Sequence, residues 1–479
     1  MTEPAPPVLR IPALWVALAI CGGLSACVHY VPRPRPPEKI VADFTARGFE
    51  DPGLRAALDR ALPARQAAWP REGWDRADLL LAMLYFNDAV AQGRAAANVA
   101  IAAQATARER PNPTLTLASE YANQHDGSPL WLWGVATDWL LDSGARRSAR
   151  VAVADLTAEQ ARYDFTELAW KTRGSLRRAL VDQVLAVREL TLLEELHSDR
   201  ASQLKMAQRQ LDLGAASRGD MDRLIADALL DEQKLNDARR RASAARSGLA
   251  GSIGVSVTAL DSVRLAWPTV DDPPLIADER LRQWRDESLL MRADVRSAVV
   301  GYSVAEEALR LEVRKQYPDV HLGPGYTWDH GIKRLQFNLG MTLPLLNRNQ
   351  GAIAEAEARR TEAGAKLEGT VATAFAEIDE GTRQWQLASA RLAQARAGIY
   401  DTAQRMYSQV ERGFEAGGND RTELVAAKIA RTLTQLQVLD AVRAAQDALA
   451  GLEDALRRPI EGPELEVDVA ARALPEYRR

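Results

Sequence analysis

The stretch LQFNLGMTLPLLNRNQG, residues 335–351, decides the fold. Its apolar side chains occupy alternate positions, which are Leu335, Phe337, Leu339, Met341, Leu343 and Leu345. Polar or small residues stand between them from Gln336 to Thr342. Alternation with a period of two over about ten residues is typical of a β-strand with one apolar and one polar face. Such a strand has the length and pattern of one that crosses a bilayer within a barrel, and a soluble sheet with one buried face is the alternative.

Similar alternation occurs elsewhere in the chain. It is strong in Trp131, Trp133, Val135, Trp139 and Leu141, and weaker in Leu115, Leu117, Tyr121, Val320, Leu322, Tyr326 and Trp328. Polar turns at 123–128 and 329–333 join the segments in pairs, so the sequence predicts four strands. Four strands alone leave two open edges, and each unpaired backbone group in lipid costs several kcal/mol. If the strands span a membrane, several chains must therefore share one barrel.

The chain also contains an internal duplication. RPNPTLTLASEY at 110–121 resembles KQYPDVHLGPGY at 315–326 in its order of proline, apolar and aromatic residues. Repeats of this kind are a sequence signature of repeated structural units. We predict one structural repeat over residues 74–270 and a second over residues 271–459, each with a helix, two strands and two further helices.

Long helices connect and follow the predicted strands. Residues 145–211 and 352–414 contain no proline, and leucine and alanine recur in them at spacings of three and four. This spacing favours coiled-coil packing of long antiparallel helices. Possible kinks are Gly174, Gly364 and Gly381.

Composition limits the class of protein. The 479 residues are 47% apolar and 26% charged, which indicates a folded chain with a core. The net charge is −4, so the chain lacks the basic excess that nucleic-acid binding requires. Its two cysteines, Cys21 and Cys27, both lie near the N-terminus, and the sequence therefore has no disulfide framework.

The N-terminus has the pattern of an export signal. Arg10 precedes an apolar run at 11–20, and the sequence LSAC then ends at Cys27. The run is too short for a transmembrane helix. It resembles a bacterial lipoprotein signal, which predicts a signal peptide at 1–26 and a covalent lipid on Cys27. A plain signal peptide is the alternative. We expect residues 27–73 to form a proline-rich tether and a periplasmic segment.

Glycine marks two turns between long helices. They are LDLGAASRGDMD at 211–222 and FEAGGNDRTEL at 414–424. An acidic residue stands six positions after each glycine, with Asp220 after Gly214 and Glu423 after Gly417. An acid in the first turn of a helix is also explained by the helix dipole, which is worth about 0.3–1 kcal/mol.

The lipoprotein signal, the duplicated strand pairs and the glycine turns together resemble the TolC family of outer-membrane efflux proteins, over roughly residues 74–459. The resemblance implies a homotrimer in the bacterial outer membrane. Each protomer would give four strands to a twelve-stranded transmembrane barrel and long helices to a periplasmic tunnel. The implied partners are a periplasmic adaptor protein, an inner-membrane efflux pump and outer-membrane lipid. Residues 460–479 would be a C-terminal tail.

The resemblance also assigns residues to surfaces. It implies that lipid contacts Phe337, Leu339, Met341, Trp131 and Trp133. It implies that Gly214, Ser217, Arg218, Gly417 and Asp420 lie in the tip turns that meet the adaptor. Candidates for the periplasmic entrance or gate are Asp220, Glu423, Phe414 and Arg421. Phe414 and Asn419 stand where some relatives have a tyrosine and an arginine, so this chain lacks that closing pair.

The exported cargo is open at this point. LPLLNRNQGAIAEAEA at 343–358 resembles the heavy-metal branch of the family, which slightly favours metal cations. The same duct could export drugs or serve type I protein secretion. A periplasmic coiled-coil scaffold lipoprotein without a pore is a third interpretation.

No motif indicates an enzyme. The five histidines do not have the spacing of a closed metal site, and no nucleophile motif occurs. His125 and His330 fall in the two predicted strand turns, where polar turn chemistry explains them more simply than a metal site. We therefore predict no catalysis, no metal site and no cofactor beyond the lipid on Cys27.

Overall fold

The computed structural model describes residues 29–63, 65, 69–121, 123, 129–142 and 145–467. Contacts divide the chain into two units, residues 1–46 and 47–479. The described part of the first unit holds helix α2 (Pro37–Thr45). The predicted signal peptide, Cys27 and His125 lie outside the described residues, and everything below concerns the second unit. Among the described residues, no helix combines the length and the apolar character needed to cross a membrane.

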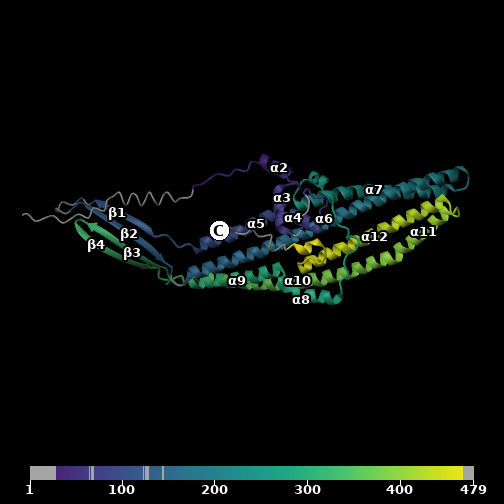
Figure 1. Cartoon of the computed structure of the whole chain (residues 1–479). Helices are drawn as coiled ribbons and strands as arrows, with labels where there is room; N and C mark the ends of the chain where they lie inside the picture. The colour runs from purple at the N-terminus through teal and green to yellow at the C-terminus, as the bar shows by residue number, and fades with distance from the viewer. Residues whose placement is uncertain are drawn as a thin grey trace, which may run out of the picture. The chain divides into compact units, whose positions relative to one another are not determined.

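The second unit is mainly helical, and each of its two halves contains a strand pair that is preceded and followed by helices (Figure 1). The first half holds α3 (Pro52–Ala61), α4 (Arg76–Phe86), α5 (Asp88–Arg108), β1 (Thr114–Tyr121), β2 (Trp131–Leu141), α6 (Arg146–Asp212), α7 (Arg218–Ile253) and η1 (Val257–Ser262). The second holds α8 (Asp278–Met291), α9 (Ala293–Arg314), β3 (Val320–Asp329), β4 (Ile332–Met341), α10 (Gln350–Gln394), η2 (Ala395–Tyr400), α11 (Asp401–Glu415), α12 (Arg421–Leu456) and η3 (Pro463–Glu466). The predicted fold class is confirmed in the described residues, which are mainly α-helical and contain four strands.

The strands form one antiparallel sheet in the order β1-β2-β3-β4. The β1–β2 and β3–β4 hairpins come from different halves of the chain, and the pairing of β2 with β3 joins them. One row of the sheet shows how the faces align, because Leu117, Val135, Tyr326 and Leu335 stand directly opposite one another. Opposite residues point to the same side of a sheet. The odd positions of β1, β2 and β4 therefore share one face with the even positions of β3.

The last strand ends earlier than its sequence pattern. β4 stops at Met341, so Leu343 and Leu345 lie beyond the sheet, contrary to the prediction. Met341 pairs with Val320, the first residue of β3. Upstream of Val320 stands Pro318, which has no N–H to donate to a further rung of the ladder. The alternation of apolar residues thus continues past the point where a partner strand exists.

Helix α6 is the centre of the helical layer, where it packs against α5, α7, α9 and α12. It is a continuous α-helix of 67 residues that includes Gly174. A Cβ atom on Gly174 would lie 2.4 Å from a carboxylate oxygen of Asp454, and one on Gly381 would lie 3.3 Å from the Cα of Leu452. These two glycines therefore permit close helix packing. The only departure from α geometry in the second long helix is η2, a π-helical segment.

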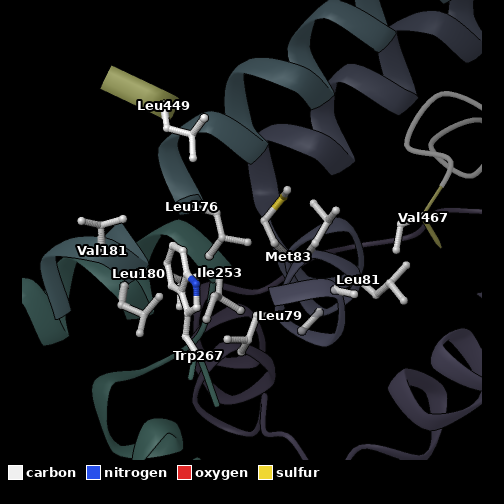
Figure 2. Close-up of a cluster of buried hydrophobic side chains, with 14 of the residues drawn as sticks. Leu79, Leu81, Met83, Leu176, Leu180, Val181, Ile253, Trp267, Leu449 and Val467 are labelled. Atoms are coloured by element: carbon white, nitrogen blue, oxygen red, sulfur yellow. The ribbon is translucent and has the colours of Figure 1, made fainter. Parts of the chain in front are cut away.

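Apolar side chains from distant segments form the main core around α4 and α6 (Figure 2). Leu79 and Met83 of α4 lie with Leu176 and Leu180 of α6 in this cluster, and each is at most 2% exposed. Trp267, in the segment between η1 and α8, belongs to the same cluster. Through this core, the segment between the two halves of the chain is packed against the helical layer.

A buried ionic network adjoins this core. It consists of three arginines and three glutamates, Arg76, Arg173, Arg177, Glu453, Glu461 and Glu464. The Glu453 carboxylate lies 2.8 Å from a terminal nitrogen of Arg173 and 3.2 Å from Nε of Arg177, and all three side chains are at most 1% exposed. Arg173 also contacts Glu464, beyond the end of α12. The network therefore ties α6 to the C-terminal segment, with equal numbers of opposite charges.

Candidate functional site

The turn between α6 and α7 is built by a glycine and a helix cap. Gly214 has φ of +70°, a left-handed conformation that favours glycine. Ser217 is the N-cap of α7, and its hydroxyl oxygen accepts a hydrogen bond from the Asp220 backbone N–H at 3.1 Å. The same hydroxyl donates to the Asp220 carboxylate at 2.7 Å. Arg218 begins the helix, and all of these residues are exposed.

The turn between α11 and α12 repeats this construction. Gly417 has φ of +76°, and Asp420 caps α12 by accepting from the Glu423 N–H at 2.8 Å. The Glu423 carboxylate accepts in return from the Asp420 N–H at 3.3 Å, which completes a capping box. Asp220 and Glu423 thus occupy equivalent positions on equivalent helices. Each has a local structural role, in agreement with the helix-terminus interpretation, and each remains exposed to solvent.

Other entrance candidates surround the second turn. Phe414 is 40% exposed near the end of α11, and Arg421 is the first residue of α12. Asn419 lies against the helix end, because a Cβ on Gly413 would fall 2.6 Å from its side-chain oxygen. Figure 1 shows both turns at one end of the second unit and the sheet at the other. The structure therefore brings the predicted tip and entrance residues to a common end, on two separate turns.

One face of the sheet, hereafter the apolar sheet face, is largely apolar and exposed, with Ser119, Thr137 and Lys333 as its polar members. Its exposed apolar members are Leu115, Leu117, Tyr121, Trp131, Trp133, Val135, Trp139, Leu141, Leu322, Tyr326, Leu335, Phe337, Leu339 and Met341. Each of these is at least 38% exposed, and Phe337 is 78% exposed. Soluble monomers rarely expose a connected apolar surface of this extent.

Aromatic side chains lie toward both ends of the apolar sheet face. Tyr121, Trp131 and Trp133 gather near the hairpin end, where the Trp131 and Trp133 rings stack at 5.6 Å. Trp139 stands near the opposite end of β2. Trp133 and Trp139 are six residue steps apart, which corresponds to about 20 Å along the strand. In a barrel with strands tilted by about 40°, this distance corresponds to about 15 Å along the membrane normal, which fits within a lipid-facing band about 25 Å tall.

The opposite face of the sheet is mostly polar or small, and Leu132, Leu140 and Ile332 are its large apolar members. Its members include Thr116, Gly134, Ala136, Asp138, His321, Gly325, Gln336, Asn338 and Gly340. The His321 Nδ1 lies 3.0 Å from an Asp138 carboxylate oxygen across the β2–β3 pair. A sheet with one apolar and one polar face has the pattern of a barrel wall between lipid and water.

His330 lies in the β3–β4 turn, where its Nδ1 is 2.7 Å from the Asp329 carboxylate. Arg334 contacts the same carboxylate at 2.9 Å, so the Asp329 carboxylate has two partners within this hairpin. In the parts of the chain that the structure describes, no group of three or more His, Cys, Asp and Glu side chains is placed to hold a metal ion.

Sequence reasoning missed the contacts that position these surfaces. The buried Arg173–Glu453 pair joins residues 280 positions apart, and the Arg396–Asp272 pair joins η2 to the segment before α8. Trp170 and Trp267 are the sequence features that could have pointed to the buried arginines. The guanidinium of Arg173 lies over the Trp170 ring and that of Arg177 over the Trp267 ring, an arrangement that is favourable where it is shielded from water.

The fold of this chain is similar to that of several solved membrane proteins. The Campylobacter jejuni CmeC outer membrane channel matches with a TM-score of 0.65 at 12% identity, over 94% of this chain and 98% of that one. The outer membrane protein VceC from Vibrio cholerae matches with a TM-score of 0.64 at 17% identity, over 81% of this chain and 97% of that one. CusC, whose structures concern transmembrane channel formation, matches with a TM-score of 0.62 at 14% identity, over 90% and 99%.

Comparison with curated protein sequences gives no match. Residues 284–456, from α8 to the end of α12, match the family model described as outer membrane efflux protein. The matched region includes β3 and β4 as well as the turn with Gly417. The second half of the chain thus matches the outer membrane efflux protein family model, and the body of the chain has a fold similar to that of these solved structures.

Proposed function

We propose that the chain is the outer-membrane duct of a tripartite efflux pump and that three copies share one twelve-stranded barrel. The two-faced sheet is the observation that carries this proposal. Its outer edges, on β1 and β4, have no strand partner among the described residues, and lipid does not tolerate open edges. Pairing β1 of one copy with β4 of the next removes every edge. A scaffold without a pore has no use for the exposed apolar sheet face.

The proposal is tested on purified full-length protein in detergent and in planar bilayers. We expect a particle with the protein mass of three processed chains, each lighter than the 52.6 kDa of the full sequence, and discrete conductance steps after insertion into the bilayer. A monomer that stays soluble without detergent would instead support the scaffold alternative.

Within this duct, the long helices form the periplasmic tunnel, and the turns with Gly214 and Gly417 meet the adaptor. We also propose that residues 74–270 and 271–459 are two structural repeats and that residues 460–479 are a C-terminal tail. The inner-membrane pump supplies the driving force, and the chain itself catalyses no reaction. Small solutes are the cargo, with metal cations favoured by the exposed carboxylates of Asp220 and Glu423 at the entrance.

Threefold symmetry makes each entrance carboxylate a ring of three, which attracts cations. We expect Asp220→Asn combined with Glu423→Gln to lower cation selectivity and to weaken block by multivalent cations in an open trimer. Since asparagine and glutamine keep hydrogen-bonding groups at these positions, the helix ends should remain formed, which circular dichroism checks. Selectivity and block equal to those of the unmodified protein would exclude the ring while leaving the duct intact.

Cys27 is the proposed site of the lipid anchor. We expect Cys27→Ala to abolish incorporation of labelled palmitate, while conductance largely survives because the barrel also holds the protein in the membrane. The Cys21→Ala variant is the matched control and should keep the label. Palmitate incorporation that persists in Cys27→Ala would refute the anchor.

A further inference from the structure

The second long helix contains one segment of different geometry. From Gln350 to Glu415 the chain is helical throughout, but residues 395–400 form the π-helical segment η2. A π segment widens the helix and is a common position for a bend. Gly398 lies within it, and a Cβ atom there would have no neighbour within 4 Å. The segment is therefore the mechanically weakest part of this helix.

Arg396 fastens the π segment to a point outside the helix. One terminal nitrogen of its guanidinium donates to the Asp272 carboxylate at 3.0 Å, and the other donates to the backbone oxygen of Asp271. The Asp271 carboxylate in turn accepts from Arg188 of α6. These contacts join α6, η2 and the segment 263–277, which we call the strap.

The strap is itself held by the core. Val270 is fully buried, and its backbone oxygen accepts from the Gln446 side chain of α12 at 2.7 Å. Trp267 is 8% exposed, and the guanidinium groups of Arg76 and Arg177 lie over its ring at 4.4 and 5.5 Å. Arg396 thus binds a fixed point that does not depend on the position of α11.

Helix α11 is supported on one side. It packs on α12, where the Arg431 guanidinium lies 4.1 Å from the Tyr407 ring, and it leads to the turn with Gly417. Its 15 residues form a lever of about 22 Å, so a bend of about 10° at η2 moves the tip by about 4 Å. A small change in angle at the π segment therefore has a large effect at the turn.

We infer that Arg396 is a positioning residue, which sets the angle of α11 and thereby the position of the turn that carries Phe414, Arg421 and Glu423. The role of that turn as an entrance rests on the proposed function. The effect of Arg396 on the angle of α11 does not rest on the proposed function, because this angle is measured within a single chain.

The test measures the distance between spin labels on Arg223→Cys in α7 and Glu415→Cys in α11, both at exposed positions. The only native cysteines precede residue 28, and a sample without the introduced pair supplies their background. Labelled protein is diluted with unlabelled full-length protein, so that only distances within one chain contribute. Arg396→Gln and Asp272→Asn should each broaden the distribution and shift its mean by about 4 Å, the displacement expected for a bend of about 10°.

Arg383→Gln is the matched control, because Arg383 pairs at 2.6 Å with Glu380 on its own helix and should leave the distribution unchanged. The charge exchange Arg396→Asp with Asp272→Arg should bring the distribution back toward that of the unmodified protein. Unchanged distances in both single variants would overturn the inference. So would a shift that the charge exchange does not reduce, since the ionic contact would then not set the angle. A protein that fails to form a trimer or to conduct would disprove the duct without altering these distances.

Discussion

Replacing Glu453 by glutamine should destabilise the protein by about 3–5 kcal/mol, the range for breaking a buried ion pair from one side. Glu453 is fully buried between Arg173 and Arg177, at 2.8 and 3.2 Å. The substitution keeps the shape of the side chain but leaves three buried arginines with two glutamates. Water cannot solvate the uncompensated arginine charge, because the side chains of Arg173, Arg177 and residue 453 are at most 1% exposed.

Urea unfolding followed by circular dichroism measures this loss. The matched control is Glu380→Gln, the same substitution in an exposed pair within one helix, which should change stability by less than about 0.5 kcal/mol. Adding Arg177→Gln to Glu453→Gln restores equal numbers of opposite charges, so the double variant should be more stable than the sum of the single effects predicts. Equal unfolding midpoints for Glu453→Gln and Glu380→Gln would show that the network contributes nothing.

The same network makes stability depend on pH. Burial alone raises the pKa of the Glu453 carboxyl, but the charges of Arg173 and Arg177 outweigh burial and hold this pKa below its usual range. In the unfolded chain the carboxyl titrates near its ordinary value of about 4.3. Its contribution is therefore complete above that pH and is lost as the pH falls through the lower pKa of the folded state. We expect Glu453→Gln to flatten this acid limb of a plot of unfolding free energy against pH, and an unchanged limb would contradict the assignment.

The features that were predictable from the sequence are those fixed by neighbouring residues. Alternation over a strand and the absence of proline over a helix are local patterns, so the sheet faces and α6 follow from them. The caps at Ser217 and Asp420 are also local, because each side chain bonds a backbone group three residues away. These signals suffice to locate the candidate lipid face and both tip turns.

The features that were missed depend on distant partners. β4 ends at Met341 because its partner β3 begins at Val320, which the alternation through Leu345 does not reveal. The π-helical segment of the second long helix contains Gly398, whereas the glycines singled out in the sequence lie elsewhere in the helices. Arg396 is held by residues more than 120 positions away, so no local pattern identifies its role.

Phe337→Arg should be among the most destabilising substitutions in the sheet, and Asn338→Arg at the neighbouring position is the control. Phe337 lies in the middle of β4 on the apolar sheet face, whereas Leu339 stands opposite Leu322 and thus in the same row as Trp139, closer to an aromatic end. The cost of an arginine on the lipid face is about 2–4 kcal/mol at the membrane centre and falls toward the interfaces. We therefore expect Phe337→Arg to be worse than Leu339→Arg, and Asn338→Arg on the polar face to be nearly neutral.

The comparison distinguishes a membrane barrel from a soluble sheet because all three positions belong to the same strand. Phe337 and Leu339 are 78% and 71% exposed in the single chain, so a soluble sheet would accept arginine at either one as easily as at Asn338. The measurement is the urea midpoint of folded protein in lipid vesicles. Equal midpoints for the three variants would reject the barrel, whereas the expected order requires lipid against the apolar face and water against the other. Since the described residues of one chain supply four strands, that order would also require the barrel to be shared between copies.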